Sequence, residues 1–226
     1  MDIYMKLAVL EQLYKLYSEF VNTQEVCCKR FCAFCCTRNV TITTLEGFYI
    51  VNQMSAKEKE DFFGFLDLDL SKDRYIPKIT INQLADCCRN GGTPPEEEID
   101  PNWTPCSLLK GEECPVYLFR PFGCRCLVSK VQCGETGFAQ IDPFILTVNT
   151  IFQQYIEHID SQGATGNAVD ILRHLKSEEF RQDYQRNDVV TGKNLISNLA
   201  IPCLMIPPEH RQKVKPILTS IHRIRV

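Results

Sequence analysis

Hydrophobic residues recur with a helical period at the start of the chain. They stand three or four positions apart, at Ile3, Leu7, Leu10, Tyr14, Tyr17 and Val21. Such steps place side chains on one face of an α-helix. The pattern therefore predicts an amphipathic helix over residues 3–21, and this helix leads directly into a dense run of cysteines.

Alternation of apolar and polar residues over 39–43 predicts a short strand. Thr43 and Glu46 then stand at the spacing of a capping box, in which two side chains satisfy free backbone N–H groups at a helix start. Ser55 and Glu58 repeat this spacing. We expect one helix to begin directly after Thr43 and another directly after Ser55.

The middle of the chain combines a helix with a long loop. Residues 80–88 read as a helix, and the Gly91-Gly92 pair that follows is typical of a helix end. From Gly91 to Pro105 the chain is rich in proline and acidic residues, which predicts an irregular loop.

Helical patterns dominate the last third of the chain. Residues 137–142 look like a strand edge, and Pro143 is placed to begin a long helix through residue 159. Helical periodicity returns over 166–175 and 207–224, where Pro216 is expected to kink the last helix.

Together these patterns predict a mainly α protein. Its helices should surround an irregular, cysteine-rich metal-binding core with a few short strands. We expect a single domain over residues 1–226, with a cysteine-cluster core at about 25–140 and a C-terminal helical region at about 141–226.

Composition narrows the possible partners. An apolar fraction of 44% supports a packed core, and a formal charge of −3 gives no electrostatic argument for binding nucleic acid. No apolar run reaches the roughly 20 residues that span a bilayer, and no secretory signal is visible. We expect a cytoplasmic protein without nucleic-acid or membrane partners. Its partner should be a small molecule or a protein that the sequence does not identify.

Thirteen cysteines make thiol chemistry the strongest functional signal. The number is odd, so complete internal pairing into disulfides is impossible. In the reducing cytosol, dense cysteine patterns favour metal binding or catalysis. Four thiols stand in CKRFCAFCC, from Cys28 to Cys36, beside basic residues that lower the pKa of thiols and promote metal binding. Cys106, Cys114, Cys124 and Cys126 form a second group, for which Cys133 is a candidate further member.

The remaining cysteines give weaker signals. Isolated Cys133 and Cys203 are expected to be buried core thiols, because free cysteine behaves as a small hydrophobic residue. Cys87 and Cys88 lie on a predicted helix and are not expected to bind metal.

The order and spacing of the two cysteine motifs resemble those of the YkgJ-like family, a cysteine-cluster domain described as chelating zinc or iron. The matching motifs are C-x3-C-x2-C-C from Cys28, Thr-x-x-Glu from Thr43, Cys106, and C-x2-Y-x2-R-P-x2-C-R from Cys114. The resemblance covers roughly residues 25–130. The metal ligands that it implies are Cys28, Cys32, Cys35, Cys36, Cys106, Cys114 and Cys124, to which this chain adds Cys126.

Iron–sulfur clusters are favoured over zinc as the bound group. The four histidines all follow the cysteine region, whereas zinc sites often combine cysteine with histidine. Cys114 precedes a proline, as cluster ligands often do. Eight thiols are enough for two clusters of the 4Fe–4S type, and seven leave one iron open to substrate. Soft thiolates accept both metals, so zinc stays the alternative.

Arg120 and Arg125 flank the second motif and are candidate cofactor-binding residues. They can balance the negative charge of a thiolate cluster or hold an anionic substrate. The alternative is that both are solvated or ion-paired. Tyr117 and Pro121 are expected to shape the turn that presents the cysteines.

The function expected is therefore that of a metal-binding protein. It should hold one or two iron–sulfur clusters through two cysteine motifs, for redox or substrate-activation chemistry. One alternative is a zinc-binding structural or interaction module. Another is a protein-modifying enzyme, because flagellin lysine methylases contain this kind of domain. A radical S-adenosylmethionine enzyme is disfavoured, since no βα alternation follows the motif.

Overall fold

The computed structural model describes residues 1–67, 74–97, 104–188 and 192–224, and in these the protein is mainly α-helical. The α-helices are α1 (Ile3–Asn22), α2 (Thr44–Asn52), α3 (Ala56–Asp67), α4 (Ile81–Arg89), α5 (Phe122–Arg125), α6 (Cys133–Thr136), α7 (Pro143–Ile159), α8 (Ala168–His174), α9 (Glu178–Gln185) and α10 (Lys215–His222). Short 3₁₀ turns cover Tyr117–Phe119 and Pro208–His210. The strands are β1 (Thr41–Thr43), β2 (Ala164–Asn167) and β3 (Leu195–Ser197).

A small antiparallel sheet joins distant parts of the chain. Its order is β1-β2-β3, with Ile42 opposite Gly166 and Thr165 opposite Ile196. Helices α2 and α8 pack on this sheet and on each other. Each strand is only three or four residues long, so most of the stability must come from side-chain burial rather than from the ladder.

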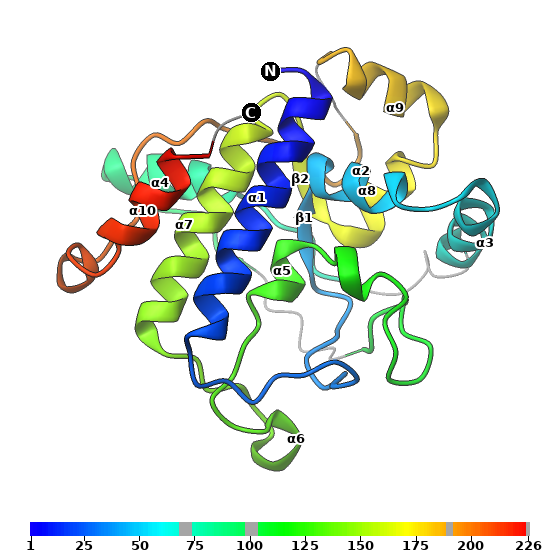
Figure 1. Ribbon diagram of the computed structural model, residues 1–226. Helices are drawn as coiled ribbons and strands as arrows, with labels where there is room; N and C mark the ends of the chain where they lie inside the picture. Colours follow the sequence, from blue (N-terminus) through cyan, green and yellow to red (C-terminus); the bar gives the residue numbers. More distant parts are fainter. Residues whose placement is uncertain (68–73, 98–103, 189–191, 225–226) are drawn as a thin grey trace.

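The core forms where α1 lies beside α7 (Figure 1). The ring of Tyr17 from α1 meets Phe122 of α5 edge-on at 4.7 Å and Phe152 of α7 at 5.3 Å, measured between ring centroids. Such pairs add to the gain from burial alone. Helix α5, which carries Cys124 of the second cysteine motif, is thereby packed into the same core as the two longest helices.

The capping signals in the sequence are confirmed. Thr43 accepts the N–H of Glu46, while the Glu46 carboxylate accepts the N–H of Thr43, and helix α2 begins at the next residue. Ser55 and Glu58 exchange the same two bonds at the start of α3. The first helix and the long helix from Pro143 are also confirmed.

Two local predictions are wrong. Residues 137–142 form no strand, because they share only isolated contacts with the neighbouring chain, among them a hydrogen bond from Lys130 N to Gln140 O. Pro216 does not kink a helix, since α10 begins at Lys215 and the proline occupies its first turn, where no N–H is needed. The predicted loop at 91–105 is irregular over 91–97, and residues 98–103 lie outside the described part.

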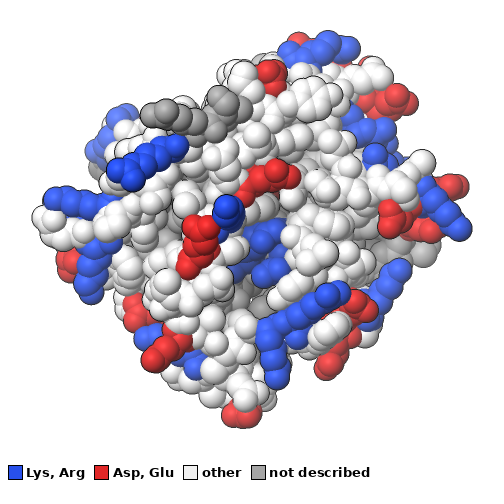
Figure 2. Space-filling model, in the orientation of Figure 1, with Lys and Arg blue, Asp and Glu red and all other residues white. Residues whose placement is uncertain are grey.

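None of the helices that the structure describes combines the length and apolar character required to cross a bilayer. The face drawn in Figure 2 carries basic and acidic side chains interspersed with one another.

A buried carboxylate, Asp160, lies at the end of α7. It accepts hydrogen bonds from the Tyr184 hydroxyl at 2.6 Å, from Leu45 N at 3.0 Å and from Asn198 Nδ2 at 3.2 Å. Burial raises the pKa of Asp160 to about 7, and the opposing effects of these bonds and of Lys6 are smaller. The neutral acid is therefore favoured in the folded protein below a pH of about 7.

Asp160 should make stability fall as the pH rises towards neutrality. An unfolded aspartate has a pKa of about 3.9, so the folded state binds this proton more tightly than the unfolded state does. The stabilisation is complete below pH ~4 and is lost as the pH rises through ~7. We expect urea unfolding of the reduced protein to give a free energy of unfolding about 2 kcal/mol lower at pH ~7.5 than at pH ~5.5.

Asp160→Asn should reduce this pH dependence. It should not abolish it, because burial also raises the pKa of Glu46 and Glu157. Asp142→Asn is the control, since a hydrogen bond from Lys130 lowers the pKa of Asp142 and places its titration at lower pH. An unchanged slope in Asp160→Asn would contradict the assignment.

Candidate functional site

Seven of the eight cysteines predicted as ligands line one pocket of about 440 Å³. They are Cys28, Cys32, Cys35, Cys36, Cys106, Cys114 and Cys124. Much of the remaining lining is apolar, including Val116, Leu127 and Leu172. The fold therefore brings thiols from two distant chain segments to the wall of a common cavity.

We call Cys28–Cys36 the first cysteine segment and Cys106–Cys126 the second. Backbone hydrogen bonds join the end of the first segment to the start of the second. Thr37 and Pro105 form an isolated antiparallel bridge. Beside it, Cys106 N donates to Cys36 O at 2.8 Å and Arg38 N donates to Thr104 O at 3.1 Å. These bonds fix Cys36 next to Cys106, so this part of the pocket does not depend on side-chain packing alone.

The beginning of the first segment is paired with the chain that follows α5. Cys27 N donates to Ser129 O at 2.8 Å, and Ser129 N donates to the Cys28 sulfur at 3.2 Å. In Figure 1 the chain between α1 and β1 and the chain that runs from α5 to α6 both pass through the lower part of the molecule. The first segment is thus held against the second at both of its ends.

A tight turn separates Cys28 from Cys32. Cys32 N donates to Lys29 O at 3.2 Å, and Phe31 inside the turn has φ 67°. That left-handed conformation costs a residue other than glycine roughly 1–2 kcal/mol. Strain of this kind concentrates at functional sites, where the surroundings hold it in place.

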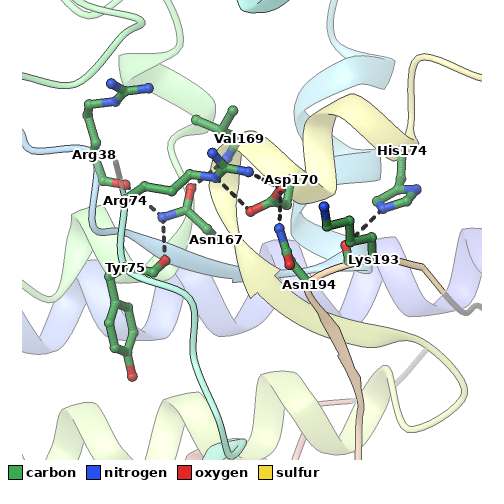
Figure 3. A network of polar contacts seen from close by, with 9 residues as sticks. All are labelled: Arg38, Arg74, Tyr75, Asn167, Val169, Asp170, His174, Lys193 and Asn194. Atoms are coloured by element: carbon green, nitrogen blue, oxygen red, sulfur yellow. Dashed lines mark hydrogen bonds and ion pairs between the residues drawn. The ribbon is translucent and has the colours of Figure 1, made fainter. Parts of the chain in front are cut away.

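The chain leaves the first segment through a polar network (Figure 3). The side-chain amide of Asn167 donates to Arg38 O at 2.7 Å and to Tyr75 O at 3.0 Å. The neighbouring Asp170 accepts two bonds from Arg74, at 2.5 and 2.8 Å, in a largely buried ion pair. The junction of β2 and α8 therefore anchors the exit of the cysteine segment.

The side chain of Glu46 anchors the second cysteine segment at the start of α5. Its Oε1 accepts bonds from the Tyr14 hydroxyl at 2.8 Å and from Phe122 N at 2.6 Å, while its Oε2 accepts Thr43 N at 2.9 Å. Burial raises the pKa of Glu46, although these bonds oppose the rise. One carboxylate thus links α1, the start of α2 and the start of α5, the helix that contains Cys124.

Gly123 allows α5 to lie against β1. A Cβ at this position would stand 3.0 Å from both Thr41 O and Val40 Cγ1, closer than an ordinary contact. Sequence analysis did not single out this glycine, although it directly precedes Cys124. The contact is visible only once the strand is placed beside the helix.

The two candidate arginines contact the protein itself. Arg125 donates from Nε to Arg120 O at 2.7 Å and from Nη2 to Leu118 O at 2.9 Å, and its guanidinium lies 4.2 Å from the Tyr14 ring centroid. Arg120 donates to Tyr117 O at 2.8 Å and stacks on the Tyr117 ring at 3.9 Å. Both line the pocket, and both brace the turn between Cys114 and Cys124.

The thiols influence one another. A hydrogen bond with Cys36 is the largest cause that raises the pKa of Cys35, and the same bond lowers the pKa of Cys36. Burial raises the pKa of Cys124, and the nearby Cys106 and Cys114 raise it further. Burial also raises the pKa of Cys114, which the positive charge of Arg120 partly offsets. Of the two adjacent thiols, Cys36 therefore ionises more readily than Cys35.

Cys126, the eighth predicted ligand, is not among the described residues that line the pocket. It is buried in the hydrophobic core and its sulfur donates to Gly123 O at 3.5 Å. Burial raises its pKa to about 12. Cys203 lies elsewhere, with its sulfur 3.6 Å from Ala85 O.

The pocket thiols do not close around a single point. Among the described residues, no group of three or more His, Cys, Asp or Glu side chains has an arrangement that could hold a metal ion. Comparisons with protein-family models, with curated proteins and with solved structures found no match to this chain. The pocket is therefore the feature of the molecule that indicates a function.

Glu46→Gln should destabilise the protein. The amide keeps one acceptor oxygen but turns an NH₂ group towards donors, so at least one buried backbone N–H loses its partner. Such a loss costs roughly 1–3 kcal/mol. Urea unfolding of the reduced protein measures the change.

Glu58→Gln is the matched control. Glu58 occupies the same position of a capping box and accepts Ser55 N at 2.8 Å, but it is exposed to solvent. Water replaces the lost acceptor there, so we expect little change in stability. Equal losses in the two variants would show that the burial of Glu46 does not matter.

Proposed function

We propose that this chain is a metal-binding protein whose cysteine pocket holds an iron–sulfur cluster of the 4Fe–4S type, for electron transfer or substrate activation. The observation that carries the proposal is the convergence of seven thiols from two separate segments on one cavity. Cysteines placed only for packing have no reason to gather in this way.

The chemistry of the donor set fits such a cluster. Iron–sulfur clusters are held by cysteine thiolates, and no histidine is among the residues described along the pocket. A single zinc ion needs four ligands at about 2.0–2.3 Å from one centre, which is a much tighter grouping than a cluster of several irons requires. Thiols spread over the wall of a shared pocket favour the larger inorganic group.

The residues of this chain have distinct roles in the proposal. The pocket cysteines supply the ligands, and the hydrogen bond from Cys35 lowers the pKa of Cys36, which favours its thiolate. Arg120 places positive charge beside thiols that become negative when they bind metal. Apolar side chains such as Val116 and Leu172 limit the access of water. A bound cluster would supply one-electron chemistry or, with an open iron, a Lewis acid.

A reducing compartment is part of this proposal. All thirteen cysteines are free thiols in the structure. Thiols at this density stay reduced in the cytosol, so we place the protein in the cytoplasm.

Anaerobic purification tests the proposal. We expect brown protein that contains iron and acid-labile sulfide, with an electron paramagnetic resonance signal after reduction. Cys124→Ala should lower the iron content strongly, because Cys124 of the second motif lines the pocket.

Cys203→Ala is the control for this experiment. Its sulfur bonds Ala85 O outside the pocket, so iron content should be unchanged. Colourless protein that contains stoichiometric zinc would show that the zinc-binding alternative holds instead of the iron–sulfur cluster. Folded protein that takes up neither metal would overturn the proposal.

A further inference from the structure

We propose that the cysteine pocket also binds a small organic anion, an apolar molecule that carries a carboxylate group. Its apolar part packs against the pocket wall, and its carboxylate pairs with the basic residues of the lining. This inference rests on the proposed function and deepens it, because it names the class of substrate that a cluster in this pocket would meet.

Thiols account for only part of the pocket wall. Four helices contribute apolar side chains to it, among them Val21 of α1, Ile50 of α2, Leu66 of α3 and Leu172 of α8. None of these side chains can bind a metal ion. The volume of about 440 Å³ lies within the range of ~300–1,000 Å³ that is typical of pockets for small molecules. The pocket therefore has an apolar surface that a metal centre alone does not explain.

The charged residues of the lining are all basic. No Asp or Glu is among the described residues that line the pocket, whereas four basic residues are: Lys29, Arg38, Arg120 and Arg125. The whole chain has a formal charge of −3, so the positive excess is local to the pocket. Positive charge around an apolar cavity favours a negatively charged ligand, and a guanidinium group matches the two oxygens of a carboxylate.

Arg120 is the basic residue best suited to bind the carboxylate. Its guanidinium stacks on the Tyr117 ring at 3.9 Å, and a stacked guanidinium keeps its edge, where the N–H groups lie, open to other partners. Among the described residues, only the Nη1 group of Arg120 has a hydrogen-bond acceptor, which is Tyr117 O. Arg125 instead donates from Nε and Nη2 to two backbone carbonyls, so its role is structural.

The hydroxyl of Ser107 is a second indication of a ligand. Ser107 lines the pocket, and its Oγ is buried without a hydrogen-bond partner among the described residues. Buried polar atoms in native proteins nearly always have such a partner. The polar group of a bound molecule can supply it.

Isothermal titration calorimetry with octanoate tests the proposal. The protein is purified anaerobically and kept reduced, and iron is determined in the same sample. We expect saturable binding of octanoate, and binding at least about tenfold weaker for 1-octanol, which has a tail of the same length but no charge. Affinity should also rise roughly fourfold for each methylene between butanoate and octanoate, because each methylene buries apolar surface.

Variants of the basic residues test the contact with the carboxylate. Arg120→Gln should weaken octanoate binding about tenfold or more, because a charge-assisted hydrogen bond is lost. Lys29→Gln, at an exposed residue of the lining, should weaken it roughly twofold to fivefold. Arg30→Gln is the matched control and should leave the affinity unchanged, since Arg30 adjoins Lys29 but is not among the described lining residues. Helical circular dichroism reports that each variant is folded.

Two alanine variants test where the tail lies. Ala168 begins α8 and lines the pocket, whereas Ala56 begins α3 and is not among the described lining residues. Ala168→Leu should lower the affinity for octanoate more than that for butanoate, because the larger side chain takes space from the longer tail. Ala56→Leu should bind both acids as the wild type does.

Equal affinities for octanoate and 1-octanol would overturn the proposal. Unchanged octanoate binding in both Arg120→Gln and Lys29→Gln would also overturn it. Iron-containing protein that binds no octanoate would show that the pocket holds a metal without this class of substrate. Protein that binds octanoate but takes up no iron would overturn the proposed metal-binding function and support the anion site, so the two failures are distinguishable.

Discussion

The buried carboxylate of Glu46 is the constraint on which the arrangement of the pocket depends. Its two oxygens accept bonds from Tyr14, Thr43 and Phe122, which belong to three separate segments. Without it, the N–H of Phe122 at the start of α5 would be buried with no acceptor at this point, and the turn that carries Cys124 would lose its link to the helical scaffold. Because a buried carboxylate is costly unless it is fully hydrogen-bonded, the three segments and the charge stabilise one another.

The same device recurs at the starts of two helices and in one irregular segment. Asp160 accepts the N–H of Leu45, and Glu157 accepts the N–H groups of Asn82 and Leu199. In each case a carboxylate satisfies a backbone donor from a remote segment. A protein with strands of three or four residues has few ladder bonds with which to fix its loops, so buried side chains must supply acceptors for backbone groups. Burial raises the pKa of all three carboxyls, and the hydrogen bonds that they accept oppose this rise.

Sequence reasoning succeeded where the signal was local. Capping residues three positions apart and hydrophobic steps of three and four fixed the starts of α1, α2 and α3, because the interacting groups lie within one or two turns. It missed β2, since the sequence ATGN shows no alternation and is held by a partner more than a hundred residues away. The cysteine motifs were visible for the same local reason. The neighbours of each thiol were not, because the pairing of Cys28 with Ser129 is decided by the fold.

The location of the core bears on what a metal would do here. Metals that build a fold are needed where the hydrophobic core is too small to do so. In this protein one core joins Ile3 near the N-terminus to Ile221 in α10. None of the pocket thiols is among its buried members, although Cys114 packs against it. The cysteine segments are instead placed against this scaffold by backbone bonds and by Glu46. The buried core of this scaffold contains none of the pocket thiols. A metal bound by these thiols would therefore serve a chemical function rather than hold the fold together.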